Sequence, residues 1–234
     1  MLKTCLLVGA AITFAASQAL AADIAGPTTY DWSGPYIGLN AGYGEADVEY
    51  QFRTIGHYNN DPGDDLSQTL DGFVAGIQTG YNWQIDSFVL GLEGGFTWLN
   101  FDQEKDSPFF DSDKFITRVN WVGSITPRLG VALDNILFFA KGGVAFAGID
   151  ARIEDTADFV ETNKTQVGWT VGGGIDYGLS ERWTVGAEGN YYDFGSFDAG
   201  KTVQDFDGSP RTDRSDHDVD TSVWTVLARA NFRF

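Results

Sequence analysis

The stretch Trp224-Thr225-Val226-Leu227-Ala228-Arg229-Ala230-Asn231-Phe232-Arg233-Phe234 ends the chain and decides its fold. Apolar and polar residues alternate along it, and a period of two indicates an extended strand. One face is apolar and ends on an aromatic residue, whereas the other face is mostly polar. Such a strand fits a transmembrane β-barrel, in which one face contacts lipid and the other lines the interior. The segment therefore predicts a bacterial outer-membrane barrel whose closing strand carries Phe232 and Phe234.

The start of the chain predicts a secretory signal peptide over residues 1–21. Lys3 supplies a positive charge, Leu6 to Ala16 form an apolar stretch, and Ala19-Leu20-Ala21 is a small-x-small cleavage site. Residues 22–31 are then expected to be a periplasmic lead-in, and residues 32–234 a single barrel domain.

Composition and charge exclude several classes of function. The only cysteine lies in the signal segment, so the mature chain offers no zinc finger, thiol nucleophile or disulfide framework. The formal net charge is −18, and binding nucleic acid would need an excess of Lys and Arg. Nucleic acid is therefore not expected as a partner, and no cofactor is expected.

Eight segments alternate with a period of two, and each is about long enough to cross a bilayer at a tilt, roughly 9–11 residues. Three connections are tight and four are long and polar. The sequence thus predicts an all-β, eight-stranded antiparallel transmembrane β-barrel with short periplasmic turns, long extracellular loops and both termini in the periplasm. The segments are 36–44, 72–83, 88–98, about 115–131, 136–147, 167–177, 183–192 and the C-terminal stretch, and the loops are about 45–71, 99–114, 148–166 and 193–220.

A soluble β-sandwich or a lipocalin-like barrel would also alternate, but it would keep its apolar face inside. Here the inward face of the eight segments carries Asn, Gln, Glu, Lys, Arg and Gly. These residues are not expected to form a dry core, and the outward face carries a girdle of Trp, Tyr and Phe that a soluble protein would not expose. The membrane barrel is the preferred interpretation.

The stretch Asp31-Trp32-Ser33-Gly34-Pro35-Tyr36-Ile37-Gly38-Leu39-Asn40-Ala41-Gly42-Tyr43-Gly44 resembles the first strand of a known family. This family is the small porin-like outer-membrane proteins of alpha-proteobacteria, called outer-membrane immunogenic proteins. The resemblance implies an eight-stranded barrel with roles in envelope integrity and surface exposure, and it implies no catalytic residues. Some relatives are linked to haem binding or pore activity, but no motif transfers either to named positions. Further segments with the same resemblance are 76–84, 91–94, 128–130, 142–145, 186–191 and 233–234.

Four charged residues are expected to point inward at mid-depth, namely Glu93, Lys141, Glu188 and Arg229. They form either a charged constriction in a pore or a salt-bridge network that plugs the barrel. The plug is favoured because eight strands enclose an interior just wide enough for side chains to fill. Glu93 and Glu188 are not expected to act as a catalytic acid–base pair, because the sequence indicates no cleft that would bind a substrate beside them. Other charges, expected near the two ends of the barrel, are Arg118, Arg128, Asp176 and Arg233.

The long loops collect acidic residues. They are interpreted as solvated surface, and a functional alternative is that they bind divalent cations that bridge them to lipopolysaccharide. His57 and His217 lie in these predicted loops and could ligate a metal or haem iron, but two isolated histidines are expected to be bystanders. The carboxylates in question include Asp61, Asp64, Asp65, Asp205, Asp207, Asp213, Asp216, Asp218 and Asp220.

The sequence as a whole predicts a non-enzymatic, integral outer-membrane protein that contributes to envelope structure and presents acidic loops. Its expected partners are outer-membrane lipid, lipopolysaccharide and, through the C-terminal strand, the barrel-assembly machinery. Two other functions remain open: a small porin that passes ions or small solutes, and a surface protein whose loops bind haem or a host ligand. The oligomeric state is left open.

Overall fold

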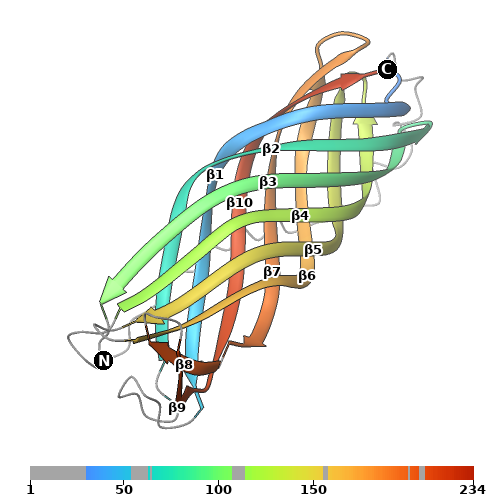
Figure 1. Ribbon diagram of the computed structural model, residues 1–234. Helices are drawn as coiled ribbons and strands as arrows, with labels where there is room; N and C mark the ends of the chain where they lie inside the picture. The colour runs from blue at the N-terminus through green and yellow to red at the C-terminus, as the bar shows by residue number, and fades with distance from the viewer. Residues whose placement is uncertain are drawn as a thin grey trace, which may run out of the picture.

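A closed antiparallel barrel forms the body of the molecule in the computed structural model, which describes residues 30–53, 63, 65–106, 114–154, 158–199, 201–205 and 209–234 (Figure 1). The predicted signal peptide and most of the predicted lead-in lie outside these residues. Within them, no helix is long and apolar enough to cross a membrane. The barrel strands are β1 (Gly34–Phe52), β2 (Asp65–Ile85), β3 (Phe88–Asp106), β4 (Lys114–Leu133), β5 (Ile136–Glu154), β6 (Asp158–Gly178), β7 (Trp183–Asp198) and β10 (His217–Arg233).

Each strand pairs with its neighbour in sequence, and β1 pairs with β10 from Tyr36↔Arg233 to Phe52↔His217 to close the barrel. This confirms the predicted eight-stranded barrel. The short turns lie at one end, which we call the turn end. Asp86 begins one of these turns in the left-handed region, with a φ of 53°, a conformation that Asp tolerates in tight hairpins. The opposite end, where the long connections lie, is called the loop end.

The strands are longer than predicted, because they continue well into the segments that were expected to be loops. Strand β1 runs to Phe52 rather than ending near Gly44, and β6 begins at Asp158 rather than near Val167. Two short strands, β8 (Lys201–Asp205) and β9 (Pro210–Ser215), form a hairpin within the last predicted loop. His217 is likewise not in a loop: it begins β10 and is buried.

The outer face of the barrel changes its chemistry along each strand. Near the turn end it is apolar: on β1 it exposes Ile37, Leu39 and Tyr43. The next outward positions on the same strand are Glu45 and Asp47. An apolar band beside a charged zone is expected where a barrel leaves lipid and enters water. The predicted lipid-facing residues of β10 follow the same rule, with Val226 and Phe234 exposed.

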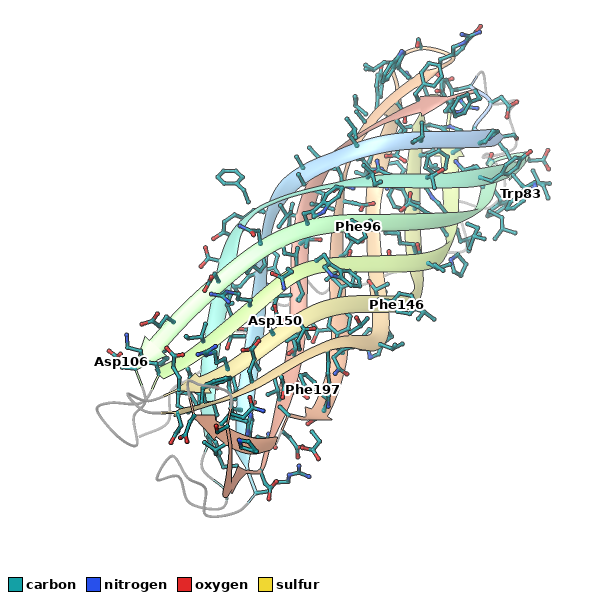
Figure 2. The ribbon with its side chains drawn as sticks, viewed as in Figure 1. Trp83, Phe96, Asp106, Phe146, Asp150 and Phe197 are labelled. Carbon is teal, nitrogen blue, oxygen red and sulfur yellow. The ribbon has the colours of Figure 1, made fainter. Side chains whose placement is uncertain are left out.

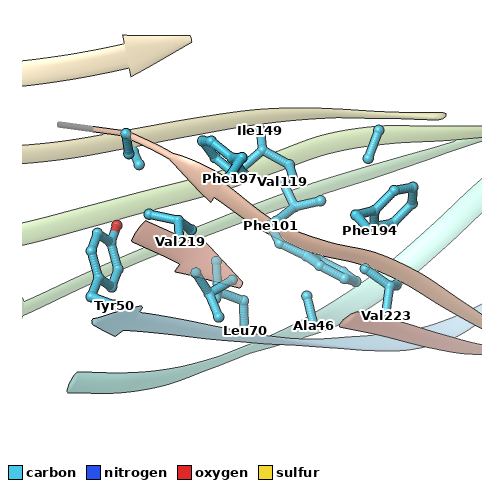
Figure 3. Close-up of a cluster of buried hydrophobic side chains, with 14 of the residues drawn as sticks. Ala46, Tyr50, Leu70, Phe101, Val119, Ile149, Phe194, Phe197, Val219 and Val223 are labelled. Atoms are coloured by element: carbon cyan, nitrogen blue, oxygen red, sulfur yellow. The ribbon is translucent and has the colours of Figure 1, made fainter. Parts of the chain in front are cut away.

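The inner face changes in the opposite sense. Near the turn end it is polar, but toward the loop end the inward residues are apolar and form a continuous buried cluster (Figure 3). The expectation that the inward face forms no dry core is therefore wrong for this half of the barrel. The cluster draws on every barrel strand and includes Ala46, Tyr50, Leu70, Phe101, Val119, Ile149, Phe194, Phe197, Val219 and Val223.

The barrel wall opens into two layers at the loop end. The β2–β3 ladder ends at Ala75↔Trp98, and the β6–β7 ladder ends at Trp169↔Asp193. Beyond these points β7-β10-β1-β2 forms one sheet and β3-β4-β5-β6 another, and Figure 1 shows the two groups of strands diverging. We call this part the loop-end sandwich, because the apolar cluster lies between the sheets. The Tyr50 hydroxyl also bonds the Thr117 hydroxyl across it, at 2.6 Å.

Candidate functional site

The structure brings the four predicted lumen charges together. Glu93, Lys141, Glu188 and Arg229 come from β3, β5, β7 and β10, and each side chain is at most 6% exposed. All four lie on inward positions of strands whose outward neighbours face lipid. Strand alternation therefore places them in the lumen, and the tilt of the strands brings them to the same depth.

Two cations hold both glutamates. The Lys141 ammonium donates to Glu93 Oε1 at 2.7 Å and to both carboxylate oxygens of Glu188 at 3.1 Å. The Arg229 guanidinium donates to Glu93 Oε2 at 2.6 Å and also to Glu188. Each carboxylate thus bonds both cations, so the four residues form a closed ring of charge-assisted hydrogen bonds, which are stronger than neutral ones.

Two further charges complete the network, and the sequence placed them at the barrel ends instead. Arg128 donates to Asp176 at 3.1 Å, and its guanidinium lies 3.5 Å from Glu93. Asp176 also lies 3.3 Å from Arg229. The network therefore contains three carboxylates and three cations, and its formal charge is zero. A balanced set is what a buried site requires, because an unpaired charge there costs several kcal/mol.

Other lumen side chains fix this network in place. The Tyr36 hydroxyl donates to Glu93 Oε2 at 2.7 Å and accepts from Arg128 at 3.0 Å. The Arg128 guanidinium also lies over the Phe139 ring, 4.0 Å from its centroid. Next to the charges, Gln78 bonds both Asn40 and Asn231, at 2.6 and 2.7 Å. These contacts leave the charged groups few alternative positions.

Glycines make room for the crowded lumen. A Cβ atom at Gly38 would lie 2.1 Å from Asn231 Oδ1 and 2.5 Å from Gln78 Nε2, and one at Gly91 would lie 2.8 Å from Arg128 Cγ. Real Cβ atoms do not approach other atoms so closely. Glycine at these inward positions therefore leaves the space that long polar side chains from neighbouring strands occupy.

The turn end of the lumen is closed by a residue that the sequence did not single out. Trp32 is buried, and its backbone N–H donates to Gln84 Oε1 at 2.7 Å. The predicted end residue Arg233 holds the same segment by donating to the Ser33 carbonyl at 2.8 Å. Between Trp32 and Arg128 is a cavity of about 10 Å³, which is room for about one water. The apolar partners of Trp32 are Val89, Ala132, Leu137 and Phe139.

The remaining predicted residues lie on the outer surface. Phe232 and Phe234 are on the lipid-facing side of β10, and their rings pack edge to face with centroids 5.3 Å apart. Their predicted contact with the barrel-assembly machinery stays a prediction. Arg118, expected at an end of the lumen, instead points outward and pairs with Asp102 at 2.8 Å. Among the residues that the structure describes, no group of three or more His, Cys, Asp or Glu side chains is placed to hold a metal ion.

Closed strand pairing, an apolar outer band and a filled polar lumen define an integral outer-membrane β-barrel. Residues 7–232 match the family described as "Outer membrane protein beta-barrel domain", and the chain belongs to this family. It is 33% identical over 216 residues to the 31 kDa outer-membrane immunogenic protein of Brucella melitensis, with 83% of this chain and 88% of that protein covered. It is 28% identical over 221 residues to the 25 kDa outer-membrane immunogenic protein of Brucella abortus, with 87% and 91% covered.

The fold is also similar to that of a solved structure, the outer-membrane protein OprG from Pseudomonas aeruginosa. The TM-score is 0.52 at 14% sequence identity, and the match covers 91% of this chain and all of that one. These findings confirm the family resemblance, the barrel fold and the location in the outer membrane.

Proposed function

We propose that this protein is a closed, non-conducting and non-catalytic barrel that contributes to envelope structure and presents an acidic surface outside the cell. The observation that carries the proposal is the filled interior. Trp32 closes the turn end, six mutually paired charges occupy the middle, and an apolar cluster fills the loop end. An ion would have to displace three different kinds of packing, and a dry apolar segment is itself a barrier to hydrated ions.

The neutral charge network supports a structural role rather than a selectivity filter. A selectivity filter attracts ions through unpaired side-chain charges, whereas each of these six charges is neutralised by an oppositely charged partner in the network. Buried ion pairs contribute little net stability, but they penalise every arrangement that leaves a charge unpaired. The network therefore selects one strand register, because a shift of one residue would turn these side chains toward lipid.

The test is the conductance of the mature protein, refolded and inserted into a planar lipid bilayer. Protein that is shown to be folded by its heat-dependent mobility on a gel should give no channel steps. Reproducible steps that change with Lys141→Glu would overturn the closed barrel and support a small porin, with the charge network as its constriction.

The proposed orientation places the turn end in the periplasm and the loop end outside. The mature chain is predicted to contain no cysteine, so single cysteines can report on each end. On intact cells, a membrane-impermeant maleimide should label Ser67→Cys near the loop end and should not label Ser180→Cys in a short turn. The opposite pattern would reverse the orientation.

A further inference from the structure

The loop-end sandwich contains two backbone edges that face each other across a seam. Beyond Ala75↔Trp98 the described residues of β2 and β3 form no ladder with each other, although β2 still pairs with β1 and β3 with β4. The β2 edge is residues 65–74 and the β3 edge is residues 99–106. We call the space between them the β2–β3 seam. Unpaired strand edges in water are templates for another strand.

One side chain shows which backbone groups point into the seam. The Lys105 ammonium on β3 donates to the Ser67 carbonyl on β2 at 3.0 Å. In an antiparallel strand the N–H and C=O of one residue point to the same side, and the next residue points to the opposite side. Ser67 and Thr69 therefore direct their backbone groups into the seam, whereas Leu66 and Gln68 direct theirs to β1.

The surroundings of the seam have a definite chemistry. Its inner side is apolar, with Leu66 and Leu70 of β2 and Phe101 of β3 buried in the cluster. Its outer side carries more acid than base: the edges expose five carboxylates and one seam cation, Lys105. Two of the five, Asp102 and Glu104, pair with Arg118 and Lys114 on β4, which leaves three to attract a basic partner. The five acidic residues are Asp65, Asp71, Asp102, Glu104 and Asp106, the last at the tip of β3 in Figure 2.

We propose that the β2–β3 seam binds an extended peptide strand by β-augmentation. The inserted strand pairs with β2 and β3 and presents apolar side chains inward and basic side chains outward. Strand pairing supplies the affinity, and the alternation of side chains supplies the specificity. The β3 edge, residues 99–106, accommodates a strand of about eight residues at roughly 3.3 Å per residue. The proposal does not depend on whether the lumen conducts.

One other occupant fits the β2–β3 seam less well, and one other seam is a poorer site. A second copy of this chain would bring its own acidic edge against these carboxylates, and like charges in opposed positions destabilise strand pairing. The second seam of the sandwich, between β6 and β7, is bridged more fully: Thr162 donates to the Ala199 carbonyl at 2.8 Å and Lys164 to the Asp198 carbonyl at 2.5 Å. The β2–β3 seam is therefore the better site for an added strand.

The experiment measures binding of a fluorescent octapeptide of alternating Lys and Val to the refolded full-length mature protein in phosphatidylcholine vesicles. Binding is read by fluorescence anisotropy. An analogue N-methylated on alternate residues keeps the charges and side chains but loses the N–H donors of one edge. The parent peptide should bind at least about tenfold more tightly than this analogue, because the analogue loses several backbone hydrogen bonds. Equal binding would show that charge alone attracts the peptide and would overturn the proposal, as would a lack of binding by the parent peptide.

Two substitutions at Thr69 distinguish the contribution of its backbone N–H to peptide binding from that of its side chain. Thr69→Pro removes an N–H that points into the seam and leaves the β1 ladder intact, while Thr69→Ala removes the same hydroxyl but keeps the N–H. Binding should be about tenfold weaker for Thr69→Pro than for Thr69→Ala, as expected for one lost backbone bond and a blocked edge.

Lys105→Ala removes both the competitor for the Ser67 carbonyl and the one seam cation, so it should tighten binding. Equal affinities of the two Thr69 variants, both shown to be folded by gel mobility, would exclude the β2 edge as the binding site. A dimer cross-linked through the seam, with no peptide bound, would assign it to a second copy instead.

Discussion

The central prediction concerns Glu93, which holds the lumen network together. Its carboxylate contacts Lys141, Arg229 and Arg128 and accepts a bond from Tyr36. Glu93→Gln keeps the size of the side chain but leaves three cations with two carboxylates. The lumen then holds one uncompensated positive charge in a site where the side chains are almost completely buried.

Removing one partner of a buried ion pair costs about 3–5 kcal/mol, and we expect a loss of this size for Glu93→Gln. Lys141→Met leaves the opposite imbalance and should cost a similar amount. The double variant is neutral again, with Asp176 and Glu188 facing Arg128 and Arg229. Its loss should therefore be smaller than the sum of the two single losses by about 2–3 kcal/mol, the coupling measured for residues of one network.

The assay is urea unfolding of the refolded protein in lipid vesicles, followed by the fluorescence of its seven tryptophans. A matched control is Glu104→Gln, which breaks an exposed pair with Lys114 at 2.6 Å. Because water screens that pair, its loss should cost no more than about 1 kcal/mol. If the losses of the two lumen variants simply add in the double variant, charge balance does not govern the stability of the lumen and the argument fails.

Three further predictions test the apolar cluster, the charged outer surface and the turn end of the barrel. Phe101→Ala opens a cavity in the apolar cluster and should cost about 3–5 kcal/mol in the same unfolding assay. Phe73→Ala on the lipid-facing surface, where Phe73 is 90% exposed, loses apolar contact with lipid but leaves no cavity, because lipid fills the space, and it should therefore cost less; equal losses would contradict the apolar core. Burial, together with Asp193, raises the pKa of the Asp220 carboxyl, so its ionisation opposes folding as the pH rises. Asp220→Asn should therefore raise stability at pH 7, and the gain should vanish in unfolding titrations below the ordinary pKa of Asp, about 3.9; a gain that persists there would rule out this cause. Trp32→Ala should remain silent in a planar bilayer, because the charge network and the apolar cluster still fill the lumen; channel steps would show that Trp32 alone closes it.

The sequence was sufficient for the part of the fold that lies in lipid. Alternation with apolar residues outward located each transmembrane segment, and the tight turns at Asp86 and Asp134 separated them. The requirement for apolar residues outward ended the predicted strands too early. Beyond Gly44 the residues of β1 still alternate, but the polar ones now face outward and the apolar ones inward. Glu45, Asp47 and Glu49 point outward there, and Ala46, Val48 and Tyr50 point inward. That exchange is visible in the sequence and could have predicted the longer strands.

The lumen was predicted in part. Counting from the turns placed Glu93, Lys141, Glu188 and Arg229 at one depth, because their strands begin at similar heights. Arg128 and Asp176 were assigned to the ends because both lie near strand ends in the sequence. Their part in the network was missed because long arginine side chains connect them to it: Arg128 reaches Asp176 and Glu93, and Arg229 reaches Asp176. Trp32 was missed for another reason: it precedes the first strand, so no alternation marks it as inward.

The exchange of polarity follows from the two solvents that the barrel meets. In hydrocarbon no backbone group finds water, so every strand must pair on both sides and the wall has to close. A closed wall of eight strands leaves a narrow interior, which polar side chains can fill only by pairing with one another. In water an unpaired edge is solvated, and the apolar residues gain most by meeting face to face as in a sandwich. The ladders therefore end at Ala75↔Trp98 and Trp169↔Asp193, close to where the outer face becomes charged. The seams are thus a consequence of leaving the membrane, and the peptide site that we propose lies at one of them.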